Sequence, residues 1–81
     1  MVDAADVDER IETIVADRLR VDADSFDDET PFAGEKLDAE SLDVVEIAEA
    51  VDAEFGVYVP DEDLAAIDRV GELKRYVAER V

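Results

Sequence analysis

Apolar residues recur at intervals of three and four in three segments of this chain, and the spacing places each set on one face of an α-helix. The first segment covers residues 3–19. The second runs from about Glu40 to Phe55 and precedes Gly56, a residue that commonly ends helices. The third follows Asp68, and together the segments predict three longer helices. Their apolar sets are Val7, Ile11, Ile14, Val15 and Leu19; Val44, Ile47, Ala48, Val51 and Phe55; and Val70, Leu73, Val77 and Val81.

A shorter helix should lie between the second and third of these. Asp61 is a good N-cap for one or two turns that carry Leu64 and Ile67, and Asp68 can cap the last helix. The tripeptide VYV is locally strand-like, but no segment alternates with period two over a useful length. Because 81 residues suffice for one small core, we expect a single all-α domain over residues 1–81, a small four-helix bundle.

The segment between the first two helices, residues 20–40, is too long for an idle connection in a small domain. Its apolar residues are spaced to enter the core one at a time and so anchor the loop. These are Val21, Phe26, Phe32 and Leu37.

The acids in VDADSFDDE raise the alternative of a divalent-cation loop. Counted from Asp22, the fifth position is Phe26 and the sixth is Asp27, where a calcium loop needs a ligand and a glycine. We therefore expect only weak, nonspecific association with cations and no metal site.

The chain contains neither cysteine nor histidine. Their absence excludes disulfides, thiol redox chemistry, nucleophile–base pairs built on Cys or His, and the zinc sites that use these ligands. The two lysines and two tyrosines are scattered along the sequence, with no second member of a site beside them. The sequence therefore predicts that the chain is not an enzyme.

The net charge of −17, from 25 acidic and eight basic residues, restricts the partners. Nucleic acid and anionic membranes would be repelled, whereas a basic protein surface would be attracted. No apolar run is long enough to cross a membrane, and the N-terminal residues lack the features of a signal peptide. We expect a cytoplasmic monomer that does not insert into membranes.

The excess of acid, with few lysines and with Ala and Val as the main apolar residues, suggests adaptation to high salt, which would screen the repulsion between carboxylates. An acidic protein from a cytosol of ordinary ionic strength is the alternative.

The second helix carries acids on the side opposite its apolar stripe. Asp43, Glu46 and Glu49 lie there at 100° per residue, with Leu42 among them and Val45 between the two faces. An exposed apolar residue ringed by carboxylates resembles a docking surface for a basic partner. The alternative is an ordinary solvated face with one exposed leucine.

Ser41 stands at the start of this helix, where a serine is ordinarily a cap. Asp38 is at least as good a cap, however, and Val44 three positions after Ser41 cannot complete a capping box. If Asp38 or Glu40 begins the helix, the Ser41 hydroxyl lies in the first turn and is free to point outward. An anionic group attached there would lie near the positive end of the helix dipole.

The chain resembles the acyl carrier protein family over nearly its whole length. In that family an aspartate–serine–leucine triplet opens the second of four helices, and Glu40-Ser41-Leu42 stands at this position. The other matches are Thr30-Pro31-Phe32, Leu37, Asp43, Glu46, Glu54-Phe55-Gly56, Val59-Pro60-Asp61, Ile67 and Val70.

The resemblance implies that Ser41 carries 4′-phosphopantetheine, whose thiol holds acyl groups as thioesters. It also implies a phosphopantetheinyl transferase and acyl-handling enzymes as partners. Their basic surfaces would meet Leu42 and the acids of the second helix, which are Asp43, Glu46, Glu49 and Asp52. Their contacts would be weak and fast, as a shuttle requires.

The chain departs from the family pattern at three positions: Glu40 replaces an aspartate, Asp38 a glycine, and Glu49 an apolar residue of fatty-acid carriers. Fatty acyl, polyketide-type and aminoacyl cargo all stay open, and a core rich in Val and Ala permits a small cleft. An unmodified interaction module that docks through the second helix is the competing function. Whether Ser41 accepts the cofactor distinguishes the two.

Overall fold

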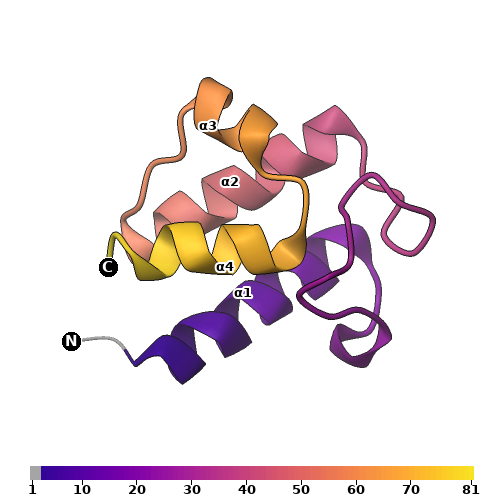
Figure 1. The fold of residues 1–81 in the computed structure, drawn as a ribbon, viewed down its shortest axis with the longest axis horizontal. Helices are drawn as coiled ribbons and strands as arrows, with labels where there is room; N and C mark the ends of the chain where they lie inside the picture. Colours follow the sequence, from indigo (N-terminus) through magenta and orange to yellow (C-terminus); the bar gives the residue numbers. More distant parts are fainter. Residues whose placement is uncertain (1–2) are drawn as a thin grey trace.

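The computed structural model describes residues 3–81, which form a bundle of four α-helices (Figure 1). They are α1 (Ala4–Leu19), α2 (Ser41–Phe55), α3 (Asp61–Ala66) and α4 (Val70–Ala78), with a 3₁₀ turn, η1 (Ala23–Ser25), in the long first loop. Helix α1 packs against α2 and α4, and the short α3 packs against α2. Residues 3–81 contain no β-strand, and the VYV segment forms neither a strand nor a β-bridge. The predicted all-α fold, with three longer helices, one short helix and a long first loop, is confirmed.

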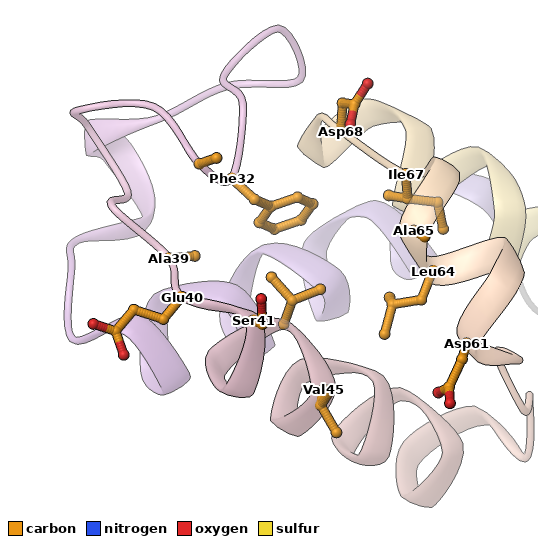
Figure 2. Close-up of a pocket in the computed structure, with 12 residues that line it drawn as sticks. Phe32, Ala39, Glu40, Ser41, Val45, Asp61, Leu64, Ala65, Ile67 and Asp68 are labelled. Carbon is orange, nitrogen blue, oxygen red and sulfur yellow. The ribbon is translucent and has the colours of Figure 1, made fainter.

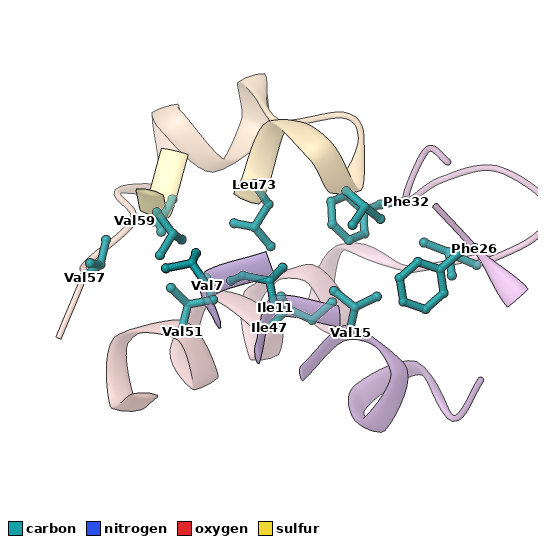
Figure 3. Close-up of a cluster of buried hydrophobic side chains, with 14 residues drawn as sticks. Val7, Ile11, Val15, Phe26, Phe32, Ile47, Val51, Val57, Val59 and Leu73 are labelled. Carbon is teal, nitrogen blue, oxygen red and sulfur yellow. The ribbon is translucent and has the colours of Figure 1, made fainter. Parts of the chain in front are cut away.

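The apolar faces of α1, α2 and α4 meet in one core (Figure 3). Most of the predicted core positions are buried, because the helical period brings them to the same side. Ile14, Leu19, Val44 and Phe55 are only half-buried, at the edges of this core. The fully buried side chains of the core are Val7, Ile11, Val15, Ile47, Val51, Val70, Leu73 and Val77.

The predicted N-caps of the last two helices, Asp61 and Asp68, are both wrong. Pro60 is the N-cap of α3, so Asp61 is its first helical residue and not its cap. Arg69 is the N-cap of α4. The predicted cap, Asp68, instead donates its own N–H group to the Glu72 carboxylate at 2.7 Å.

The Glu72 carboxylate is the cap that the sequence did not indicate. It accepts a second hydrogen bond, from the N–H group of Arg69 at 2.9 Å. These two backbone hydrogen bonds, from Asp68 and then Arg69, lower the pKa of Glu72 because they stabilise its ionised form. At the other end, α4 stops at Ala78, so Val81 lies beyond the helix and is 46% exposed.

The long first loop is fastened to the start of α4. The N–H group of Phe32 donates to the Asp68 carbonyl at 2.9 Å, and that of Val70 donates to the Thr30 carbonyl at 3.2 Å. These bonds form an isolated antiparallel bridge. Three of the four predicted anchors, Phe26, Phe32 and Leu37, are buried, whereas Val21 is half-buried. The loop is therefore a structural part of the bundle, as its apolar residues predicted.

A buried lysine ties the same loop to two helices. Lys74 of α4 is 5% exposed, and its Nζ lies 2.6 Å from a Glu12 carboxylate oxygen of α1 and 2.5 Å from an Asp28 oxygen of the loop. Burial alone would lower the pKa of Lys74, but the hydrogen bonds to Asp28 and Glu12 outweigh it and raise the pKa. The lysine that the sequence placed in no site thus has a structural role.

Gly71 allows this close approach between α4 and the loop. Its N–H group donates to the Asp28 carbonyl at 2.9 Å. A Cβ at position 71 would lie 2.9 Å from the Asp28 Cβ and 3.0 Å from its carbonyl oxygen. No ordinary side chain fits there without a shift of the backbone.

Gly71→Ala should therefore destabilise the fold, although alanine is the better helix former by about 1 kcal/mol. The clash with Asp28 should lower the free energy of unfolding by about 1–3 kcal/mol, as measured by urea denaturation. Arg75→Ala, at an exposed position of the same helix, is the control and should change it by less than about 0.5 kcal/mol. A stabilised Gly71→Ala protein would contradict the tight contact.

Candidate functional site

Helix α2 begins with a cap that does not use Ser41. Glu40 is the N-cap residue, and its N–H group donates to the Asp43 carboxylate at 3.0 Å. Ser41 is the first helical residue and its side chain is exposed. A capping box therefore forms one residue earlier than a Ser41 cap would require, and the Ser41 hydroxyl is left out of it.

The chain turns sharply just before this helix. Asp38, the other predicted cap, is not one: its φ of +46° places it in the left-handed region, where Asp is tolerated better than most residues. Its N–H group donates to the Gly34 carbonyl at 2.7 Å, and that of Ala39 donates to the Phe32 carbonyl at 2.8 Å. This turn presents Ser41 beside the anchored loop.

An open cleft of about 340 Å³ lies between the start of α2, the loop and α3 (Figure 2). Ser41 is among its lining residues, and its side chain points toward the space between Phe32 and Leu64, whereas Glu40 points away. The walls are mostly apolar, and Asp61 and Asp68 add carboxylates. The apolar side chains that line it include Phe32, Ala39, Val44, Leu64 and Ile67.

The sequence permitted such a cleft but did not locate it. Phe32 belongs to the loop, Val44 to α2, and Leu64 to α3, so no motif or period connects them. The sequence feature that could have indicated the cleft was an apolar residue at the edge of each predicted core face. Half-burial marks Val44, Leu64 and Ile67 as cleft residues, and only the fold brings them together.

The predicted docking residues differ in exposure. Leu42 is 66% exposed, as its position among the acids predicted, and Val45 is 38% exposed. Glu49 and Asp52 are also exposed, so α2 presents apolar and acidic groups to solvent.

Two further acids of this face, Asp43 and Glu46, are half-buried, and an Asp43 oxygen is used in the helix cap. The ion pairs among residues 3–81 involve none of Asp43, Glu46, Glu49 and Asp52. The face is therefore acidic without internal compensation.

Within residues 3–81, no group of three or more Asp or Glu side chains is arranged to hold a metal ion. Helices long and apolar enough to cross a membrane are likewise not found in the part of the chain that the structure describes.

Comparison with known proteins gives the context of this arrangement. The family model described as the phosphopantetheine attachment site matches residues 9–77. The acyl carrier protein of Picosynechococcus sp. is 42% identical over 72 residues, which are 89% of this chain and 88% of that protein. The chain belongs to the acyl carrier protein family.

Acyl carrier proteins bear a covalently attached 4′-phosphopantetheine group, and they are carriers rather than catalysts. A phosphopantetheinyl transferase modifies them, and they interact with acyl-handling enzymes. This membership confirms the predicted family, cofactor and carrier function. It also accounts for a chain that contains neither Cys nor His, because the reactive thiol of an acyl carrier protein belongs to its prosthetic group.

Proposed function

We propose that Ser41 is the attachment residue for 4′-phosphopantetheine and that this chain, a single domain, presents acyl thioesters to partner enzymes in the cytoplasm. The observation that carries the proposal is the position of Ser41. Its side chain is exposed at the first residue of α2, and the cap of that helix is made by Glu40 and Asp43. The hydroxyl is therefore accessible without the loss of a cap.

The start of α2 suits a phosphodiester. The first N–H groups of a helix have no intrahelical acceptor, and they form the positive end of its dipole. An anion on the Ser41 oxygen would lie beside them, with α2 long enough, at 15 residues, for a full dipole. Exposed Glu40, whose side chain points away from the cleft, is available to the transferase, as Leu42 is.

The cleft beside Ser41 favours an aliphatic acyl cargo. When bound, the prosthetic group supplies the thiol that forms the thioester. The chain contributes an apolar space lined by Phe32, Leu64 and Ile67, which would exclude water from an alkyl segment. The carboxylates of Asp61 and Asp68 at the same cleft would disfavour an anionic cargo.

We propose that partner enzymes dock on the exposed face of α2. Leu42 and Val45 supply apolar anchors. Glu46, Glu49 and Asp52 supply negative charge for basic partner surfaces. Asp43 contributes through the carboxylate oxygen that does not accept the capping hydrogen bond. This docking face serves a modified carrier. The alternative of an unmodified interaction module is not favoured, because the chain belongs to a family defined by phosphopantetheine attachment.

The proposal is tested by intact mass after incubation with coenzyme A and a broad-specificity phosphopantetheinyl transferase, in a salt concentration that keeps both proteins folded. We expect a gain of one phosphopantetheine per chain. A folded protein that gains no mass with several transferases would contradict the proposal and favour the alternative, an unmodified interaction module.

We further propose that the acidic surface is an adaptation to high salt, and we expect the melting temperature to rise with potassium chloride. Between about 0.1 M and 1 M salt the screening length falls from about 10 Å to about 3 Å. In a domain of this size, each kcal/mol of relieved repulsion raises the melting temperature by about 4–8 °C. We therefore expect the melting temperature, followed by circular dichroism, to rise by at least about 4–8 °C between these salt concentrations.

A variant that removes charge from exposed sites away from α2 tests whether repulsion between carboxylates causes the salt dependence. The combined substitution Asp17→Asn, Asp24→Asn and Glu35→Gln should weaken the salt dependence, because these carboxylates are exposed and form no ion pair within residues 3–81. A melting temperature that is unchanged between dilute buffer and molar potassium chloride would refute the adaptation.

A further inference from the structure

A second groove, of about 220 Å³, lies between α2, the segment after it and α3. It shares Val45, Asp61 and Leu64 with the cleft beside Ser41, and Ala48 and Val59 complete its apolar lining. Its volume is below the range of about 300–1,000 Å³ that is typical of small-molecule sites. The groove is therefore of a size for one side chain of another protein.

The charge around this groove is entirely negative. Glu49, Asp52 and Asp61 line it and are exposed, and neither Lys nor Arg is among its lining residues. The ion pairs found within residues 3–81 leave out all three of these carboxylates. A cationic side chain would be attracted here and would meet no competing cation in the groove.

Tyr58 adds an aromatic ring to the same groove. It is 70% exposed, whereas its neighbours Val57 and Val59 are 6% and 4% exposed. Burial thus alternates along this segment, and Tyr58 lies toward solvent between two buried valines. An exposed aromatic ring beside apolar and acidic groups is typical of the residues that dominate binding energy in interfaces.

The other tyrosine shows what such a ring binds within this chain. The guanidinium carbon of Arg80 lies 3.4 Å from the centroid of the Tyr76 ring. The Tyr76 hydroxyl donates to an Asp63 carboxylate oxygen at 2.6 Å. Tyr76 thus combines an aromatic face, a guanidinium and a carboxylate, whereas the Tyr58 groove offers the ring and carboxylates without the guanidinium.

We propose that the Tyr58 groove binds an arginine side chain of a partner protein. The aliphatic stem would contact Val45 and Leu64, and the guanidinium would lie over the Tyr58 ring within reach of Glu49 and Asp52. Arginine fits better than lysine because its planar, weakly hydrated group both stacks on rings and pairs with carboxylates. The inference rests on the proposed docking through α2 and extends that surface to the segment between α2 and α3.

The test uses the ¹⁵N-labelled, unmodified chain and the capped tripeptide Gly-Arg-Gly, at the lowest salt that keeps the protein folded. Matched tripeptides carry lysine or norleucine at the centre. We expect the arginine peptide to shift the amide signals of Ala48, Tyr58, Val59 and Leu64 and to bind more tightly than the other two. Tyr58→Ala should weaken its binding about two- to fivefold, while Tyr58→Phe should retain it, because the ring face is the binding element.

Three outcomes would overturn the inference. Equal shifts from the norleucine peptide would assign the groove to apolar cargo, as an extension of the cleft beside Ser41. Equal binding by the lysine peptide would indicate general attraction to an acidic protein. The same would follow if Asp17→Asn, a control at an exposed position of α1, weakened binding of the arginine peptide as much as Tyr58→Ala does. The mass gain of Tyr58→Ala with coenzyme A reports separately on the proposed carrier function, which does not require the groove to bind arginine.

Discussion

Ser41→Ala should leave the protein folded but abolish its mass gain with coenzyme A and a transferase. The substitution removes the hydroxyl oxygen on which the proposed phosphodiester would form. It should cost little stability, because Glu40 and Asp43 make the cap of α2 and the Ser41 side chain is exposed. Loss of a serine that acts as an N-cap would instead cost about 1 kcal/mol. Intact mass and urea denaturation of the same sample measure both effects.

Ser25→Ala is the matched control, because Ser25 and Ser41 are the two serines of the chain. Ser25 is also exposed, and its hydroxyl donates to the Asp22 carbonyl at 2.6 Å. This variant should gain one phosphopantetheine as the parent protein does. A gain in Ser41→Ala, or its loss in Ser25→Ala, would show that the attachment residue is assigned wrongly.

Leu73→Ala should unfold a large fraction of the protein. Leu73 is 1% exposed and projects from α4 into the centre of the core, toward Ile11 and Ile47 (Figure 3). Truncation of a buried leucine costs about 2–5 kcal/mol, through lost burial and the cavity left behind. Domains have a total stability of only about 5–15 kcal/mol, and a small one lies near the lower value. The shift of the urea midpoint measures the cost.

Leu42→Ala provides the comparison at the same residue type. Leu42 is 66% exposed, so its truncation should change the free energy of unfolding by less than about 0.5 kcal/mol. It should nevertheless weaken the association with partner enzymes, if Leu42 is a docking anchor. Similar losses of stability in the two leucine variants would contradict the packing described for α2 and α4.

The helices could be predicted because buried apolar residues recur along the whole length of each one. A spacing of three and four places Val7, Ile11 and Val15 on one side of α1, and the fold buries that side. The ends were less predictable, since a cap depends on the backbone angles of one residue. Asp38 has the chemistry of an N-cap but the wrong φ, and Asp68 donates to Glu72 instead of capping α4.

The residues of the proposed site divide in the same way. Ser41 and Leu42 could be proposed from the sequence because the family motif marks both, and the helical period places Leu42 among the acids. The cleft was not found, because Phe32 and Leu64 come from segments that only tertiary packing joins. Tyr58 and the buried Lys74 were also missed, because exposure and ion pairing are set by neighbours that are distant in sequence.

The attachment of α3 has a mechanical consequence for the cleft. No residue of α3 is fully buried, and the Asp63–Tyr76 hydrogen bond supplies one of its few ties to the bundle. The opposite wall is held firmly, since the loop is pinned to α4 by the Pro31–Arg69 bridge and by Lys74. Weakly held elements open at a lower free energy than the core does. If the cleft holds the acyl cargo that we propose, α3 is the wall that could yield to cargo of different lengths, while the core beside Ser41 keeps its shape.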